Sequence, residues 1–163
     1  MFYSPCPLTI LFATETGTAA ALADWALATA NRMGVPARLG DMATYNTFRL
    51  SSERTLLLIA ATHGEGEPPQ TASDFFDFLD ETDIALTGIR FGVLALGDSG
   101  YDHFCAAGKR LDRRLEELGA TRVAPRRDID VGERASARDW LADFIATTAA
   151  AATDRQGRAG WSG

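Results

Sequence analysis

Hydroxyl groups surround a glycine where an apolar run gives way to an alanine-rich segment. The run LTILFA is followed by ATETGTAAAL, residues 13–22, in which Thr14, Thr16 and Thr18 surround Gly17. A helix that begins at this glycine directs unpaired backbone N–H groups and a positive partial charge toward the loop. The hydroxyl groups add hydrogen-bond donors, so the pattern predicts a site for a phosphate group. The threonines could instead only cap the helix.

This loop lacks the familiar nucleotide-binding motifs. The Gly-Lys-Ser/Thr ending of nucleotide triphosphatases is absent, and GxGxxG does not follow the strand. We therefore expect one phosphate monoester, bound by backbone dipoles and hydroxyl groups without a cationic side chain in the loop.

Two further loops follow apolar runs. THGEGEPPQTA, residues 62–72, contains Gly64 and Gly66, which allow a flat ligand to approach the backbone, although such residues can also form a simple turn. LGDSGYDHFCAAGK, residues 96–109, places Tyr101 in a polar setting, where an exposed ring suits stacking on a planar ligand. Phe104 is expected to pack in the core rather than stack.

Other kinds of chemistry are less well supported. The two histidines, His63 and His103, occur on different loops without a cysteine at ligand spacing, so we expect no metal site. Glu65 and Glu67 lie in a Gly/Pro-rich loop that fixes no separation between two catalytic carboxylates. They are expected to form a solvated acidic rim.

Bulk composition indicates one globular domain. The chain has 163 residues and a net charge of -6, which favours a basic partner surface and argues against nucleic-acid binding. The first residues lack a basic leader and a long apolar run, so we expect neither signal peptide nor membrane span and a cytoplasmic location. A bridge between Cys6 and Cys105 is not expected there.

Apolar runs alternate with helical patterns along the chain. This alternation predicts a doubly wound α/β fold with a five-stranded parallel sheet, strand order 2-1-3-4-5 and helices on both faces. The expected strands are 8–14, 37–39, 55–62, 90–97 and 121–130, and the expected helices are 17–33, 71–79, 105–118 and 136–149. Residues 1–149 are expected to form the domain, and 150–163 a loose tail with too little apolar content to pack. The carboxyl ends of the strands would then bring the three loops together.

The three loops together resemble a known family. TETGTA, THGEGEPPQTA and LGDSGYDHFCAAGKRLDRRLEELGA are similar to the flavodoxin-like FMN domain of sulfite reductase flavoprotein and diflavin reductases, and to small stand-alone flavodoxin-like proteins. The similarity continues through RRDIDVGERASARDWL and covers about residues 8–146. It implies a flavodoxin-like fold and an FMN cofactor.

The resemblance also implies which residues contact FMN. The phosphate would contact Thr14, Glu15, Thr16, Gly17, Thr18 and Ala19. The ring would lie between the segment Ala61, Thr62, His63 and Gly64 and the segment Leu96, Gly97, Asp98, Ser99, Gly100, Tyr101, Asp102, His103, Phe104 and Cys105. Tyr101 would be the main stacking ring, and Asp130 lies where the family can approach the flavin. Neither a catalytic residue nor a metal is implied.

The implied function is electron transfer by bound FMN. The relatives continue into a connecting domain and an NADPH/FAD domain, whereas this sequence ends at Gly163. We therefore expect an electron carrier, or one part of an oxidoreductase system, that works between a separate NADPH/FAD-type reductase and an acceptor such as sulfite reductase. The partners are expected to dock on the acidic loops. The His63–Gly64 peptide could turn to hydrogen-bond the ring as it gains a proton.

Two other functions use the same fold or ligand. A phosphorylation-controlled receiver needs an acidic pair after the first strand, an aspartate after the third and a lysine after the fifth. This chain has Thr14-Glu15, Thr62-His63 and Asp128 in those places, which disfavours a receiver. A flavin-binding accessory module that passes no electrons remains an alternative.

Overall fold

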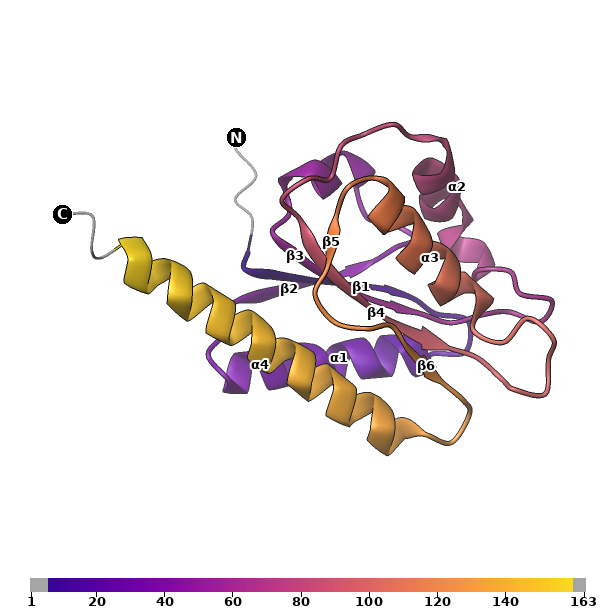
Figure 1. Cartoon of the computed structure of the whole chain (residues 1–163). Coiled ribbons are helices and arrows are strands. Elements are labelled where there is room, and N and C mark those ends of the chain that lie inside the picture. Colours follow the sequence, from indigo (N-terminus) through magenta and orange to yellow (C-terminus); the bar gives the residue numbers. More distant parts are fainter. Residues whose placement is uncertain (1–5, 160–163) are drawn as a thin grey trace.

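A parallel sheet lies between two layers of helices (Figure 1). The computed structural model describes residues 6–159, with 152–159 described by their backbone alone. The strands are β1 (Leu8–Ala13), β2 (Ala37–Asp41), β3 (Thr55–Ala60), β4 (Arg90–Leu96), β5 (Thr121–Arg122) and β6 (Arg127–Ile129). The helices are α1 (Thr18–Arg32), α2 (Ser73–Glu81), α3 (Ala106–Glu117) and α4 (Arg134–Ala159), with short 3-10 helices at Thr47–Ser52 and Gln70–Ala72.

The strand order β2-β1-β3-β4-β5 confirms the predicted topology, and all pairs of strands are parallel. One expectation was wrong: the fifth strand is divided into β5 and β6, which both pair with β4. The segment between β5 and β6 contains Pro125, which has no N–H group for a sheet hydrogen bond. The carbonyl of Pro125 accepts a hydrogen bond from the Trp140 indole at 3.2 Å, which ties the break to α4.

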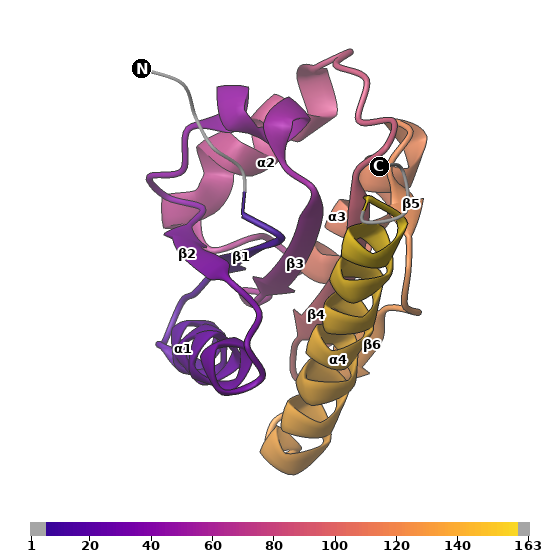
Figure 2. The ribbon, with the colours of Figure 1, turned by 90° about the vertical axis from the view of Figure 1, so that its left-hand side faces the viewer.

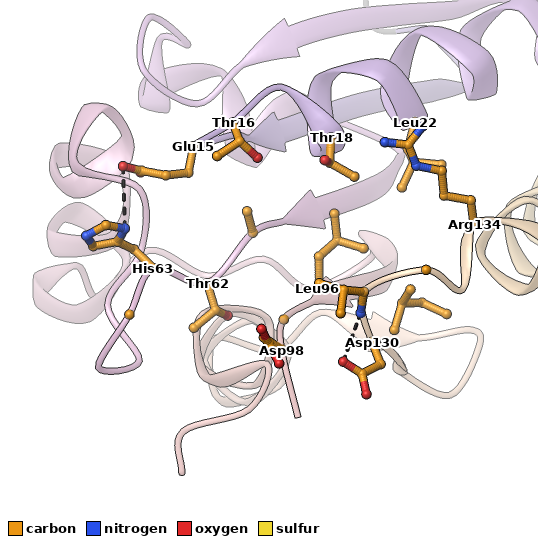
Figure 3. Close-up of a pocket in the computed structure, with 16 residues that line it drawn as sticks. Glu15, Thr16, Thr18, Leu22, Thr62, His63, Leu96, Asp98, Asp130 and Arg134 are labelled. Carbon is orange, nitrogen blue, oxygen red and sulfur yellow. Dashed lines mark hydrogen bonds and ion pairs between the residues drawn. The ribbon is translucent and has the colours of Figure 1, made fainter. Parts of the chain in front are cut away.

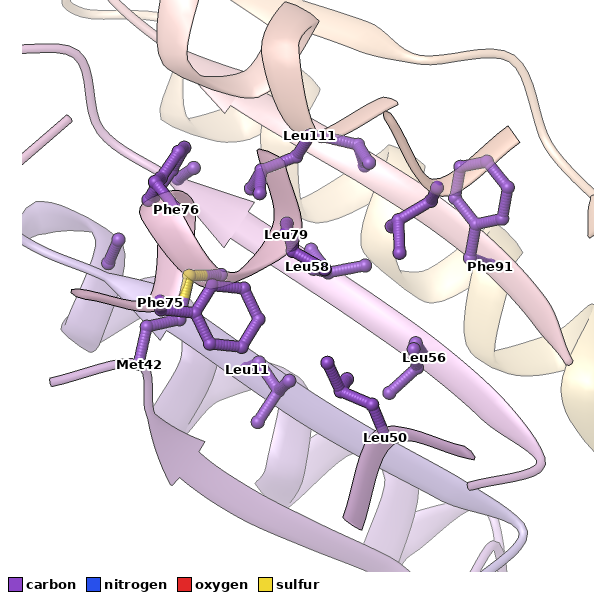
Figure 4. Packing of buried hydrophobic residues seen from close by; sticks show 14 of the residues in the cluster. Leu11, Met42, Leu50, Leu56, Leu58, Phe75, Phe76, Leu79, Phe91 and Leu111 are labelled. Atoms are coloured by element: carbon purple, nitrogen blue, oxygen red, sulfur yellow. The ribbon is translucent and has the colours of Figure 1, made fainter. Parts of the chain in front are cut away.

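Each face of the sheet is covered by two helices. On one face α2 and α3 pack against Leu11, Leu58 and Phe91 in the core that Figure 4 shows. On the other face α1 and α4 lie side by side over Ile10 and Ile59 (Figure 2). Every residue of β3 is buried, as its uninterrupted apolar run predicts for a central strand.

Helix α4 extends beyond the point where the sequence predicts a tail. It runs to Ala159, so residues 150–159 are helical where a loose segment was expected. Residues 149–152 are all alanine, the residue with the highest helix propensity, which favours continuation of the helix. The domain boundary at residue 149 stays a prediction, and residues 160–163 lie outside the described residues.

Helix α3 approaches β4 very closely at Gly108. A Cβ atom at this position would lie 2.2 Å from the Cβ of Ala95 and 2.8 Å from its Cα. Both atoms belong to a strand that is paired on both sides, so the strand cannot give way easily. The small size of Gly108 thus sets the distance between α3 and the sheet.

We expect Gly108→Ala to lower the free energy of unfolding by about 2 kcal/mol, because overpacking costs more than the gain in helix propensity. Urea denaturation of Gly108→Ala and of the exposed control Arg113→Ala on the same helix measures the difference. A Gly108→Ala variant as stable as the wild type would show that α3 can move away from β4.

Cys105 immediately precedes α3 and is fully buried, with a positive φ of 58°. Its thiol donates a hydrogen bond to the carbonyl of Ala95 at 3.3 Å. Burial, with the nearby charge of Asp128, raises the pKa of the thiol to about 12. Cys6 is partly exposed, and both cysteines are free. Cys105 therefore stays protonated and unreactive at neutral pH.

A thiol reagent at pH 8 should modify Cys6 rapidly and Cys105 only after unfolding. The Cys6→Ser variant should therefore show no rapidly reacting thiol until denaturant is added. Rapid modification of that variant in its native state would mean that the start of α3 opens readily.

Candidate functional site

A pocket with a volume of about 350 Å³ lies at the carboxyl ends of β1, β3, β4 and β6 (Figure 3). This volume falls in the usual range for small-molecule sites. The residues that line it are Glu15, Thr16, Thr18, Leu22, Ala61, Thr62, His63, Gly64, Leu96, Gly97, Asp98, Ile129, Asp130, Val131, Gly132 and Arg134. The three predicted loops therefore meet at one edge of the sheet. They do so because the segments that follow parallel strands all begin at the same edge.

Much of the predicted site lines this pocket. The predicted residues found in the lining are Glu15, Thr16, Thr18, Ala61, Thr62, His63, Gly64, Leu96, Gly97 and Asp98. Those outside the lining are Thr14, Gly17, Ala19, Ser99, Gly100, Tyr101, Asp102, His103, Phe104 and Cys105. The phenol of Tyr101 is exposed and Cys105 is fully buried. Their predicted contacts with a flavin stay predictions.

A fourth segment completes the pocket, between β6 and α4. Asp130 lies in the lining, where the resemblance places it. Lining residues that sequence reasoning missed are Leu22, Ile129, Val131, Gly132 and Arg134. The sequence did hold a signal for most of them, because the segment after the last parallel strand must reach the same edge as the other three loops.

The first loop presents free backbone donors to the pocket. Gly17 has a φ of 96°, and its N–H group donates to the hydroxyl of Thr14 at 3.0 Å. The first helical hydrogen bond runs from the N–H of Ala21 to the carbonyl of Gly17 at 2.9 Å. The N–H groups of residues 18–20 precede this bond and have no acceptor within the helix. Thr14 therefore shapes the loop, while the start of α1 remains able to bind an anion.

The second loop is a tight turn closed on itself. The N–H of His63 donates to the carbonyl of Glu67 at 2.7 Å, and the carbonyl of His63 accepts from the N–H groups of Gly66 and Glu67 at 2.9 and 3.1 Å. Gly66 has a φ of 103°, and a Cβ atom there would lie 2.6 Å from the Cβ of His103. The second loop consequently packs directly on the third.

Side chains connect the loops to one another. Nδ1 of His63 lies 3.5 Å from Oε1 of Glu15, which joins the first and second loops at one end of the pocket (Figure 3). The hydroxyl of Thr62 accepts a hydrogen bond from the N–H of Ala107 at 3.2 Å. The second loop therefore also supports the start of α3.

Asp130 holds the third loop against the fourth segment. Its carboxylate accepts hydrogen bonds from the N–H of Ser99 at 2.9 Å, from the Ser99 hydroxyl, and from the N–H of Val131 at 2.8 Å. These bonds, the Ser99 hydroxyl above all, lower the pKa of Asp130 below its ordinary value. The carboxylate is consequently negatively charged at neutral pH.

The described part of the chain supports neither a metal site nor a membrane helix. No group of three or more His, Cys, Asp or Glu side chains within residues 6–159 is arranged to hold a metal ion. Within the same residues, no helix has the length and apolarity needed to cross a bilayer.

Comparisons with known proteins agree with this geometry. The family model for flavodoxin matches residues 10–140. NADPH oxidoreductase A of Dictyostelium discoideum is 43% identical over 127 residues, which is 77% of this chain and 20% of that protein. The sulfite reductase [NADPH] flavoprotein alpha-component of Bacillus subtilis is 41% identical over 135 residues, covering 82% of this chain and 22% of that protein. The chain thus spans about a fifth of the length of these relatives.

Solved structures show the same architecture over nearly their whole length. The flavodoxin of Streptococcus pneumoniae TIGR4 has a TM-score of 0.79 and 25% identity, covering 90% of this chain and 99% of that one. Oxidised flavodoxin 2 from Bacillus cereus has a TM-score of 0.73 and 26% identity, covering 87% of this chain and 97% of that one. With the family model matched across the sheet and all four pocket segments, the chain belongs to the flavodoxin family.

Proposed function

We propose that this chain binds FMN in the pocket and passes single electrons between a separate reductase and an acceptor protein. The observation that carries the proposal is the convergence of a helix N-terminus with two glycine-bordered loops in one pocket. Flavodoxins are the standard example of FMN bound at the switch point of a doubly wound sheet. When bound, FMN supplies the redox chemistry, and the protein supplies binding and electrostatics.

The lining residues fit the two ends of FMN. The start of α1, with the hydroxyls of Thr16 and Thr18, offers donors to a phosphate group. The opposite part of the lining includes Gly64 and Gly97, which leave room for a flat ring beside the backbone. A Cβ atom on Gly97 would lie 2.7 Å from the backbone nitrogen of Cys105, so a larger side chain does not fit there.

Carboxylates beside the pocket would oppose a gain of negative charge by the cofactor. Asp98 and Asp130 both line it, and the lowered pKa of Asp130 keeps that group charged. Negative charges beside the ring would disfavour an anionic reduced cofactor and so favour the release of its electron.

The proposed turning of the His63–Gly64 peptide would carry a cost. The carbonyl of His63 already accepts hydrogen bonds from the N–H groups of Gly66 and Glu67. A rotation that points this carbonyl toward a ring proton breaks those bonds, at a cost of about 1 kcal/mol for each. The turn at His63 would therefore influence how readily a bound flavin takes up a proton.

The proposed partners are a reductase of the NADPH/FAD type and an acceptor such as sulfite reductase. The similarity to NADPH oxidoreductase A and to sulfite reductase flavoproteins supports this class of partner. Glu65 and Glu67 are on the second loop, and Asp98 and Asp102 are on the third, beside the proposed ring site. The two free thiols are consistent with the cytoplasm as the place where these proteins meet.

Binding of FMN through its phosphate is tested at Thr16. Thr16→Ala should weaken FMN binding by about 1 to 3 kcal/mol, because a donor to a charged oxygen is lost, and should change riboflavin binding much less. Titration of both flavins into the apoprotein measures this, with the exposed Thr147→Ala as control. Equal losses for the two flavins would show that the first loop does not hold phosphate.

Electron transfer is distinguished from simple flavin binding by stepwise reduction. A one-electron carrier should show a radical signal in electron paramagnetic resonance near half reduction and should then reduce an acceptor protein. A protein that binds FMN but gives neither result is the accessory module.

Docking of a basic partner is tested by the salt dependence of the reaction. Reduction by a basic-faced reductase should slow as salt rises, because the acidic rim is screened over about 8 to 10 Å at physiological ionic strength. Neutralising Glu65 and Glu67 together should also slow reduction while FMN stays bound, as stopped-flow spectroscopy can measure. Replacement of the exposed Asp139 and Asp143 on α4 by Asn is the charge-matched control. A rate that is independent of salt and the same in wild type and double variant would place the docking surface elsewhere.

A further inference from the structure

We propose that Arg134, at the start of α4, binds the phosphate group of the flavin together with the start of α1. This inference rests on the proposed binding of FMN. Among the described residues that line the pocket, Arg134 is the one lysine or arginine, whereas Glu15, Asp98 and Asp130 supply carboxylates. Its side chain therefore determines where in the pocket an anion is favoured.

The fold brings Arg134 to the phosphate end of the pocket. Strands β1 and β6 run in the same direction, so the helices that follow them begin at the same edge of the sheet. Helices α1 and α4 also contact each other on one face (Figure 2). In Figure 3 the side chain of Arg134 extends toward Leu22 on α1, on the same side as Thr18 and at the opposite end from His63.

Among the described residues, no acidic side chain lies within ion-pair distance of Arg134. The pocket carboxylate nearest in sequence, Asp130, is already bonded to Ser99 and Val131 and points away from Arg134 in Figure 3. Arg134 is exposed. Its guanidinium is consequently available to a ligand.

The positive end of a helix dipole is an unfavourable place for a cation when no anion is bound. Arg134 is the first residue of α4, and the first turn of this helix contains no acidic residue. The N-terminus of a helix carries a positive partial charge, which repels a cation. A phosphate between the starts of α1 and α4 interacts favourably with both helix ends and with the guanidinium, so it removes this conflict.

The chemistry of the two partners is complementary. A guanidinium group presents parallel N–H donors that match two oxygens of a phosphate and retains its charge at all relevant pH values. Riboflavin, which ends in a hydroxyl group, offers no such pair of charged oxygens. The contribution of Arg134 should therefore appear in the preference for FMN over riboflavin rather than in flavin binding generally.

The test compares Arg134→Gln with Arg138→Gln, one turn further along α4. Arg138 is exposed, is absent from the pocket lining, and lies over the Trp25 ring at 5.6 Å. Arg134→Gln should weaken FMN binding about tenfold, as expected for a hydrogen bond to a charged group, and riboflavin binding less than twofold. The phosphorus NMR resonance of bound FMN should shift in Arg134→Gln and stay in place in Arg138→Gln.

Several results would overturn the role of Arg134 without affecting the proposed function. One such result is an equal affinity for FMN in the wild type and in Arg134→Gln. Another is a loss of affinity in the variant that is the same for FMN and for riboflavin. An unchanged preference for FMN together with an altered reduction potential would place the guanidinium at the ring instead. By contrast, a wild-type protein that binds neither flavin would contradict the proposed function itself.

Discussion

The register of the parallel sheet is the constraint on which the site depends. Ala13 at the end of β1 pairs with Ala60 at the end of β3, and Ala60 pairs with Ala95 near the end of β4. Leu96 in turn pairs with Ile129 at the end of β6. Because these pairs are fixed by backbone hydrogen bonds, four loops leave the sheet at nearly the same level. A shift of one residue in any strand would move its loop along the pocket and turn its side chains to the other face.

Beyond the sheet, the loops are held by contacts with one another rather than by the hydrophobic core. Glu15 contacts His63, Thr62 accepts from Ala107, and Ser99 donates to Asp130. Each of these contacts joins segments that are distant in sequence. A single exposed polar contact stabilises a protein by about 1 kcal/mol or less, so their combined effect is mainly to restrict the loop conformations before a ligand arrives. Restriction of this kind lowers the entropy cost of binding.

The features that sequence could predict are those set by local chemistry. The apolar run of β3 indicated a central strand, and the expected helix 105–118 is followed by Gly119, whose φ of 100° is typical of a glycine just after a helix. The place of Arg134 in the pocket lining depends instead on which segments meet in space, whereas the division between β5 and β6 has a local signal in Pro125. Cys105 lay within a polar loop in sequence, yet a single left-handed residue turns its thiol into the core. Neighbouring residue types alone did not indicate that turn.

Charge is distributed unequally along the pocket, although the protein carries a net charge of -6. The starts of α1 and α4 provide positive partial charge at one end, where Arg134 adds a full charge. Asp98 and Asp130 lie toward the third loop. A ligand with a dianionic phosphate at one end and a neutral ring at the other would lower its electrostatic energy in only one orientation. If FMN binds as proposed, the same arrangement would separate two tasks, since binding energy would come from the phosphate end while the carboxylates would act on the charge of the ring. Substitutions near the proposed ring position would then change the reduction potential without the loss of the cofactor.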